Sequence, residues 1–327
     1  SITRDRDNET GTVTVKILGR DKYYLKDTLT EDNIFVYVDN IENPDKPVKT
    51  ITKQLTKITN TAELDGADTG YTLTLGNFGK YDGKVKIKNQ TDYELTQEML
   101  TPDVKIDNKN ILIFHTHSCE SYASSEKYPY TPTGNFRTTD LNYTVARLGD
   151  ELTNYLMSFG FNVVHDKTYH DYPAYTGSYT RSKATVENAL KSNPSDIIID
   201  LHRDAIGSKS DYDPSVKIGE ETAAQLMFVI GTNGGGLYHP NWGSNLKFAI
   251  EFQAKANEMY PGLFKTMIVR NSRYNQNLGK AACIIEVGST GNTLEQCINS
   301  MKYLSKVFEE YREQKRILIT LTPIRTF

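Results

Sequence analysis

The sequence is poor in cysteine, in net charge and in long apolar runs, and each shortage excludes a class of protein. Its 327 residues include three cysteines, which are too few for a disulfide scaffold. The formal net charge is -3 and no long basic run occurs, so there is no reason to expect a nucleic-acid partner. No apolar run approaches the ~18 residues that a membrane-spanning helix needs. We expect any signal or anchor segment to lie outside this chain.

The chain divides into two parts that differ in their pattern of apolar and polar residues. Residues 1–93 alternate apolar and polar side chains in short segments, which is the period of half-buried strands. These segments are 12–18, 33–39, 71–75 and 84–88. Their pattern resembles the immunoglobulin-like repeats of clostridial surface proteins, so we expect a small all-β sandwich that serves as a spacer or binds the wall. Residues 94–109 are polar, and we interpret them as a linker.

From residue 110 to 312 apolar runs alternate with helical patterns. Alternation of this kind predicts an α/β domain with a mostly parallel sheet covered by helices on both faces. The expected strands are 111–114, 161–164, 197–201, 225–230, 267–269 and 282–287, and the expected helices are 141–156, 181–192, 246–259 and 294–308. Residues 313–327 form a tail, which is apolar and β-like from Arg316 and contains Pro323; an added edge strand and a disordered end both remain open.

Three of the expected strands end in residues that bind metals or transfer protons. The first runs into His117 and Glu120, the second ends at His202, and the third ends at Glu286. Carboxyl ends of parallel strands meet at one edge of a sheet, where open α/β sheets bind ligands. Two imidazoles and one carboxylate, with a fourth position left for water, are a usual ligand set of hydrolytic zinc. We therefore predict zinc bound by His117, Glu120 and His202.

Glu286 is the expected general base. It follows four apolar residues, and a carboxylate that closes such a strand is costly unless it is paired, protonated or metal-linked. Desolvation raises the pKa of a carboxyl group toward neutrality, which suits proton transfer beside a zinc-bound water. A structural, salt-bridged acid is the alternative.

Other residues near the strand ends leave alternatives open. Asp140 stands just before a helix, where it serves as an N-cap or replaces Glu120 as the third ligand. His115 points away from His117 if the strand continues, which favours a role behind the ligands or against the substrate. Cys119 as a thiol nucleophile lacks a base oriented by a third group. Arg203 is a candidate for binding a peptide carboxylate. Three histidines in loops are expected at the surface: His165, His170 and His239.

These motifs resemble those of the stage II sporulation protein P family, over residues 111 to 311. The resemblance is carried by the segments HTHSCESY at 115–122, NFRTTD at 135–140, VHDKT at 164–168, HDY at 170–172, GSYTR at 177–181 and IDLHRDA at 199–205. It implies a zinc-dependent N-acetylmuramoyl-L-alanine amidase, in some members also an endopeptidase, with a zinc-amidase-like fold. Members remodel septal peptidoglycan during engulfment. The immunoglobulin-like segment is not expected of the family and keeps a vegetative or surface-anchored hydrolase open.

The resemblance also assigns roles. Zinc amidases have a strand-end histidine, a helix-start glutamate, a second strand-end histidine and a catalytic glutamate near the C-terminus. His117, His202 and Glu286 match three of these positions. The helix-start glutamate has no counterpart, because threonines stand there with Asp140 beside them, so Glu120 is assigned as third ligand and Asp140 is its rival. Arg137, in the 135–140 motif, is expected with His115 and Arg203 around the ligands or the substrate.

The resemblance implies peptidoglycan as substrate, a lytic transglycosylase and a membrane protein of the engulfment machinery as partners, and an extracytoplasmic location in the wall or at the membrane. Two alternatives stand beside the amidase. One is a zinc peptidase that cuts stem or cross-bridge peptides. The other is a wall-binding surface protein with no catalytic activity.

Overall fold

The computed structural model describes residues 85–315, apart from 107–108, 132, 134 and 206–211, and it also assigns the backbone of several strands before this range and of one helix after it. Two compact units are present, Ser1–Asp65 and Gly66–Phe327. In the first unit the assigned strands are β1 (Ile2–Asp7), β2 (Thr12–Ile17), β3 (Lys26–Asp27), β4 (Ile34–Phe35) and β5 (Thr50–Gln54). β2 pairs antiparallel with β1 and β5. The predicted strands 12–18 and 33–39 overlap β2 and β4, but whether these strands form an immunoglobulin-like sandwich lies outside the described residues.

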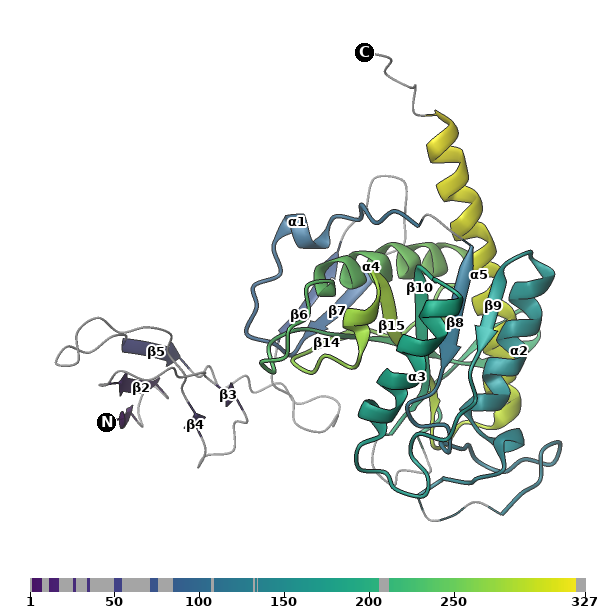
Figure 1. Cartoon of the computed structure of the whole chain (residues 1–327), viewed down its shortest axis with the longest axis horizontal. Helices are drawn as coiled ribbons and strands as arrows, with labels where there is room; N and C mark the ends of the chain where they lie inside the picture. Colours follow the sequence, from purple (N-terminus) through teal and green to yellow (C-terminus); the bar gives the residue numbers. More distant parts are fainter. Residues whose placement is uncertain are drawn as a thin grey trace. The chain divides into compact units, whose positions relative to one another are not determined.

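The second unit is built on an eight-stranded sheet (Figure 1). Its strand order is β6 (Tyr71–Leu75), β7 (Val85–Asn89), β14 (Met267–Arg270), β13 (Leu226–Gly231), β15 (Ala281–Ser289), β10 (Ile197–Asp204), β8 (Asn110–Phe114), β9 (Asn162–His165). Neighbouring strands are parallel except in the pairs β6–β7 and β13–β15. The prediction of a mostly parallel sheet is confirmed. The antiparallel pair β13–β15 makes the two halves of the sheet run in opposite directions.

The boundary predicted at residue 93 lies too late. β7 pairs parallel with β14, where Ile87 lies opposite Met267, and antiparallel with β6, so the predicted strands 71–75 and 84–88 both belong to the large sheet rather than to the N-terminal domain. The alternation of β7 is real, because Val85 and Ile87 are buried, but alternation alone does not say which sheet a strand joins. The predicted linker contains the short helix α1 (Gln97–Leu100), which Thr96 caps by accepting a hydrogen bond from the Met99 amide.

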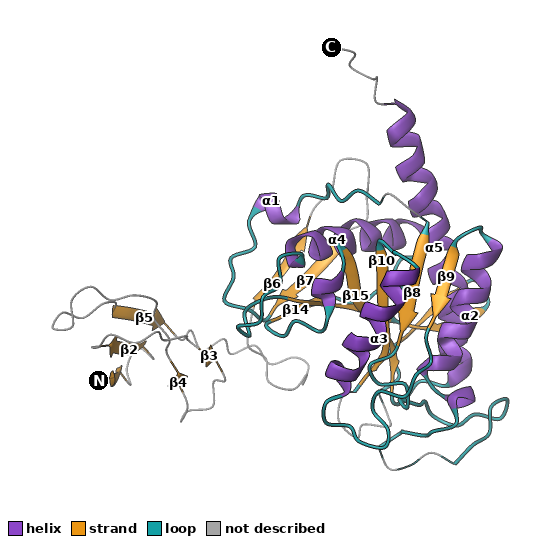
Figure 2. Ribbon diagram, in the orientation of Figure 1, coloured by secondary structure: helices purple, strands orange, loops and turns teal. Residues whose placement is uncertain are grey.

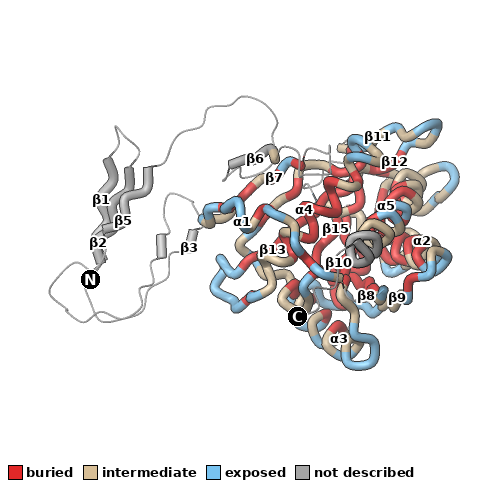
Figure 3. Tube along the Cα trace, turned by 90° about the horizontal axis from the view of Figure 1, so that it is seen from above, coloured by how far each residue is buried: buried red, intermediate tan, exposed pale blue. Residues whose placement is uncertain are grey.

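Helices cover both faces of the sheet, as predicted (Figure 2). On β8, Ile111 and Ile113 face the large core that α2 (Val145–Ser158), α4 (Trp242–Met259) and α5 (Leu294–Leu321) complete. Leu112 and Phe114 point the other way and pack against Val186 of α3 (Ser178–Ser192). Figure 3 shows the central strands as buried, with exposed residues gathered in the connecting loops. The remaining elements are η1 (Leu141–Tyr143), η2 (Gln276–Leu278) and the hairpin of β11 (Ser215–Ile218) and β12 (Glu221–Ala224).

The tail differs from the prediction as far as Leu321. α5 continues to this residue, so the first part of the β-like tail is helical. The charged run 309–316 favours a helix, and no helix-breaking residue occurs before Pro323. Residues 322–327 lie outside the described residues. Among the helices that the structure describes, none combines the length and the apolar character needed to cross a membrane.

Candidate active site

The predicted strand ends meet at one edge of the sheet. In the parallel pair β10–β15, His202 lies directly opposite Glu286, and β8 lies on the other side of β10. Side chains alternate along a strand, so Asp200 and His202 point to the same face as Ile198, which packs under α3. Glu286 shares the parity of Ala282 and points to this face as well. The site therefore lies on the α3 side of the sheet, at the carboxyl ends of its parallel strands.

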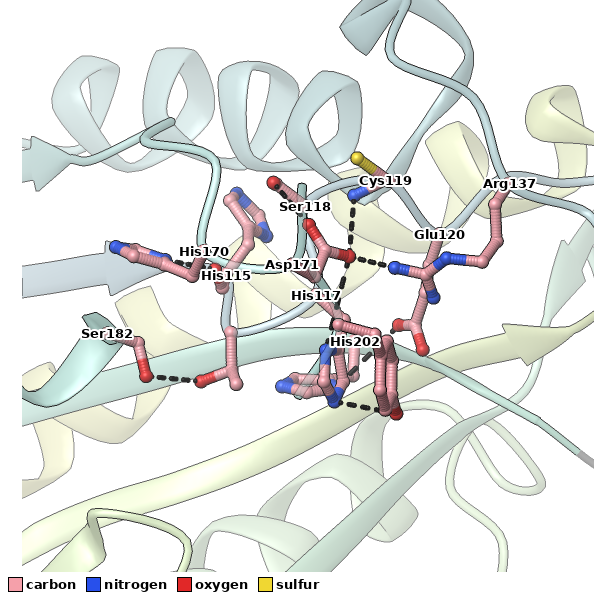
Figure 4. Close-up of polar contacts among 12 residues, drawn as sticks. His115, His117, Ser118, Cys119, Glu120, Arg137, His170, Asp171, Ser182 and His202 are labelled. Carbon is pink, nitrogen blue, oxygen red and sulfur yellow. Dashed lines mark hydrogen bonds and ion pairs between the residues drawn. The ribbon is translucent and has the colours of Figure 1, made fainter. Parts of the chain in front are cut away.

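The three predicted zinc ligands lie in one buried cluster (Figure 4). The rings of His117 and His202 are 5.2 Å apart between centroids and nearly perpendicular. A turn after β8, in which the Glu120 amide donates to the His117 carbonyl at 3.1 Å, brings Glu120 back toward the strands. One carboxylate oxygen of Glu120, Oε2, lies 3.7 Å from His202 Nδ1 and accepts a hydrogen bond from the Arg203 amide at 3.0 Å.

The chemistry of this cluster fits zinc. Two imidazoles and a carboxylate are ligands that zinc prefers. His117 Nδ1 and Glu286 Oε2 are buried and have no hydrogen-bond partner, which is costly unless a further group binds them. Within the described part of the chain, however, no group of three or more His, Cys, Asp or Glu side chains is arranged so that it could hold a metal ion. Binding would thus require His117, Glu120 and His202 to draw closer together.

Asp200 holds His202 and was not singled out in the sequence. Its Oδ1 lies 2.8 Å from His202 Nε2, and the Thr116 amide and hydroxyl donate to the carboxylate at 2.8 and 2.6 Å. Burial opposes a charge on His202, but the carboxylates of Asp200, Glu120 and Glu286 outweigh it and raise the pKa of His202 to about 10. A carboxylate on the far nitrogen is the usual device that orients a metal-binding histidine. The sequence offered one signal: an aspartate inside an apolar run.

The carboxyl group of Glu286 has the environment that the sequence predicted. Burial, together with the carboxylates of Asp204 and Glu120, raises the pKa of Glu286 to about 8, although His202 and Arg203 act in the opposite direction. Its pKa therefore lies near the range in which a general base works. Arg203 is itself buried, and two of its guanidinium nitrogens, Nε and Nη1, have no partner.

A second carboxylate, Asp171, approaches from the loop between β9 and α3. It forms an ion pair with Arg137 and accepts hydrogen bonds from the Ser118 hydroxyl and the Cys119 amide at 3.2 and 3.3 Å. Its Oδ2 lies 4.0 Å from His117 Nδ1. Burial raises the pKa of the Cys119 thiol to about 12, and Asp171 adds to this effect, so the thiolate is strongly disfavoured. The predicted Arg137 thus acts through Asp171 beside the cluster.

His115 lies behind the cluster rather than in it. The ring is fully buried, and Nδ1 is 2.9 Å from the carbonyl oxygen of Leu201, which can only accept a hydrogen bond. Burial, and next the nearby His165, lower the pKa of His115 to about 3, so the ring is neutral. Its Nε2 lies 2.8 Å from Nε2 of His165. His115 thus links β9, through His165, and β10, through the Leu201 carbonyl.

Gly149 of α2 makes room for the two histidine rings. A Cβ atom at this position would lie 2.2 Å from His165 Nε2 and 2.9 Å from His115 Nε2. We expect Gly149→Ala to lower the free energy of unfolding by about 1–3 kcal/mol, because overpacking outweighs the gain in helix propensity. Chemical denaturation measures this. Gly243→Ala is the control, since nothing lies within 4 Å of its Cβ, and it should leave stability unchanged or raise it. Equal effects of the two alanines would contradict the prediction.

Asp140, the rival ligand, is exposed and caps η1. Its Oδ1 accepts hydrogen bonds from the amide and the side-chain nitrogen of Asn142 at 3.1 and 2.8 Å. This is the N-cap role that the sequence offered as its alternative. The structure therefore brings Glu120, and not Asp140, to the two histidines.

Two of the three histidines expected at the surface, His170 and His239, are buried, and the third, His165, ends β9 and is partly buried. His170 Nδ1 donates to the His115 carbonyl at 2.7 Å, and Nε2 lies 2.9 Å from the Thr185 hydroxyl. His239 is 1% exposed, and neither of its ring nitrogens has a hydrogen-bond partner. Surface placement of histidines in loops is a statistical tendency, and packing of these loops onto the domain overrides it.

His239 should make stability sensitive to acid. Burial, assisted by Arg273, lowers the pKa of His239 from 6.5 to about 4, so the folded state favours the neutral ring. Its contribution to stability is complete above pH 6.5 and is lost as the pH falls toward 4. We expect His239→Leu to remove an acid-dependent loss of about 3 kcal/mol, which urea unfolding at pH 7 and pH 4 measures as a difference from wild type. Parallel pH dependences of the two proteins would contradict it.

Comparison with known sequences identifies relatives. A model of the family "Stage II sporulation protein P (SpoIIP)" matches residues 16–309. Stage II sporulation protein P of Bacillus subtilis (strain 168) is 30% identical over 237 residues, which cover 68% of this chain and 56% of that protein. The chain thus spans little more than half the length of this relative. The family match begins well before residue 111 and includes most of the segment predicted to be immunoglobulin-like.

Solved structures of amidases share part of the arrangement. The CwlD amidase of Clostridioides difficile, in complex with the GerS lipoprotein, aligns over 64% of this chain and 100% of its own at 12% identity and a TM-score of 0.41. The catalytic domain of CwlV, an N-acetylmuramoyl-L-alanine amidase from Bacillus (Paenibacillus) polymyxa var. colistinus, aligns over 62% and 98% at 14% identity and a TM-score of 0.38. The fold assignment rests on the strand order and packing of this chain itself.

Proposed function

Because the chain belongs to the stage II sporulation protein P family, we propose that it is a peptidoglycan hydrolase that acts on the cell wall during sporulation. The bond cleaved in this proposal is the amide between the lactyl group of N-acetylmuramic acid and the L-alanine of the stem peptide. The observation that carries the proposal is the meeting of His117, His202 and Glu286 at three strand ends, with buried atoms of His117 and Glu286 left unpaired. Such a substrate requires an extracytoplasmic location. The proposal also includes, as partners, a lytic transglycosylase and a membrane protein of the engulfment machinery.

The residues of the cluster have separate tasks. His117, Glu120 and His202 would hold zinc, which when bound supplies a water of lowered pKa and a Lewis acid for the amide carbonyl. Glu286 takes the proton of the attacking water at Oε2 and returns it to the departing nitrogen of L-alanine, so that the C–N bond breaks to a carboxylate and an amine. Asp200 keeps His202 oriented through Nε2. Arg203, whose buried guanidinium has unpaired N–H groups, is placed to bind a carboxylate or a developing negative charge.

Product analysis tests the proposal. Purified peptidoglycan is digested by the protein with added zinc, and the soluble products are identified by mass spectrometry, with a chelator-treated sample as control. We expect free stem peptides with an L-alanine amino terminus, absent after chelation. Cut peptides still attached to muramic acid would assign the site to a peptidase instead. Binding to peptidoglycan without any soluble product would identify a wall-binding protein and refute the hydrolase.

A further inference from the structure

The loop between β9 and α3 exposes aromatic rings. Few large hydrophobic side chains are exposed among the described residues: Met157, Tyr169, Tyr172, Tyr175, Leu237 and Tyr238. Three of them, at 169, 172 and 175, lie in this loop and are 38%, 56% and 57% exposed. We call residues 166–177 the tyrosine loop. Exposed apolar groups gathered in one place indicate an interaction surface more strongly than the same groups scattered.

The tyrosine loop is braced from below. His170 and Asp171 are buried, at 1% and 6% exposure, between the outward-facing tyrosines. Arg181 of α3 donates its Nε to the His170 carbonyl at 2.7 Å and its Nη1 to the Thr176 carbonyl at 3.1 Å, and it also bonds the Ala174 carbonyl. A loop held in this way loses little conformational entropy when it binds a partner. The rings are therefore presented in a fixed arrangement.

One of the exposed rings, Tyr175, contacts the catalytic cluster. Tyr175 stacks on His117 with ring centroids 4.5 Å apart, and its hydroxyl lies 3.1 Å from His117 Nε2. Arg137, whose guanidinium carbon is 5.1 Å from the centre of the Tyr175 ring, is neutralised by Asp171 (Figure 4). Tyr169 and Tyr172 lie 6.1 Å apart between centroids.

We propose that Tyr169, Tyr172 and Tyr175 form a platform for the glycan strand of peptidoglycan, with Tyr175 at the end nearest the scissile bond. A pyranose ring presents C–H groups on its faces and hydroxyl or acetamido groups at its edge. A tyrosine offers the complement, an apolar ring with a polar tip. Arg137 and Lys167, the cations beside the tyrosines, are both paired within the protein, with Asp171 and Asp150, so the surface suits a neutral sugar better than an anion. This inference rests on the proposed function, in which the cleaved bond joins the glycan to the peptide.

The test measures glycan binding apart from hydrolysis. Glycan strands freed of stem peptides are titrated into Glu286→Gln protein by calorimetry, so that no turnover occurs. Tyr169→Ala/Tyr172→Ala in the same background should raise Kd by roughly tenfold or more. Tyr169→Trp/Tyr172→Trp, which keeps aromatic faces, should bind within a few-fold of the parent. Tyr238→Ala is the matched control: this tyrosine is 78% exposed, in the loop that leaves β13 at the opposite edge of the sheet, and Kd should not change.

Each outcome supports the platform or overturns it. Unchanged affinity of the folded double alanine variant, or loss of binding by the tryptophan variant as severe as that of the alanine variant, would overturn it. So would failure of the parent to bind glycan strands, and a protein partner captured in a tyrosine-dependent manner would then be the competing occupant. If wild type releases no peptide yet binds glycan strands through the tyrosines, the proposed hydrolysis fails and the platform stands.

Discussion

Replacing Glu286 by glutamine should reduce the rate of peptide release by a factor of about 10²–10⁴, the usual contribution of a general base. The variant keeps the shape of the side chain and removes its ability to accept a proton at Oε2, an atom that is buried and unpaired in the structure. The rate is measured from the appearance of new amino termini in digests of peptidoglycan with zinc. Glu187→Gln, which removes an equal charge from the surface of α3, should leave the rate unchanged. Activity of Glu286→Gln within a few-fold of wild type would remove Glu286 from the mechanism.

The same variant should fold at least as well as wild type without metal. The pKa of Glu286 is raised from 4.5 to about 8 by burial first of all, so the folded state favours the protonated carboxyl. Stability from this preference is complete below pH 4.5 and is lost as the pH rises through 8. Glutamine resembles the neutral acid and does not titrate. We therefore expect the free energies of unfolding of metal-free wild type and variant to diverge as the pH rises from 4.5 to 8, with the variant the more stable, and the difference to stay constant above pH 8.

Among changes to the residues that support the metal-binding cluster, replacing Asp200 by asparagine should lower the free energy of unfolding most. It leaves the hydrogen bonds from Thr116 in place but removes the charge that faces His202 at 2.8 Å. Loss of one partner from a buried ion pair costs about 3–5 kcal/mol, because the other charge is left uncompensated. We expect this loss in the free energy of unfolding of the chelator-treated protein at pH 6. Asp103→Asn, at an exposed ion pair, should change stability by less than about 1 kcal/mol.

Two further measurements separate the pairing of Asp200 from a packing effect. The folded pKa of His202 is about 10 against an ordinary 6.5, so the contribution of the pair is complete below pH 6.5 and lost as the pH rises through 10. The stability difference between wild type and Asp200→Asn should therefore shrink at high pH, whereas a packing defect would persist. Zinc affinity, measured by competition with a chromophoric chelator, should fall by about 10–100-fold. Unaltered affinity would show that Asp200 does not orient His202.

The sequence predicts the strand ends well. An apolar run marks a buried strand, and the polar residue that follows it, His117, His202 or Glu286, marks the carboxyl end of that strand. The residues that support them were harder to find. Asp200 lies two residues before His202 on β10, so strand alternation puts both side chains on one face, but it does not say that they touch. Asp171 comes from a loop whose path depends on Arg181 and His170. The contacts of Asp171 join positions distant in sequence, and periodicity carries no information about them.

The same limit explains the errors in the fold. β7 has the alternation of a half-buried strand, but only pairing with β14, nearly 180 residues later, decides which sheet it enters. The apolar residues of the tail, taken alone, favour a strand, whereas the charged turns that precede them continue α5 to Leu321. Local propensity correctly predicts that residues 84–88 form a strand, but it does not predict which strand they pair with.

The change of strand direction between β13 and β15 has a practical consequence for handling the molecule. It places the loop after β13 at the edge of the sheet opposite to the one that carries His117, His202 and Glu286. A fluorophore or a surface tether attached at Tyr238, the most exposed of the large side chains described, would leave the catalytic edge facing outward. Molecules immobilised in this orientation would present the catalytic edge to an insoluble substrate such as the cell wall. Attachment to the wall could then be observed on single molecules without altering the catalytic residues.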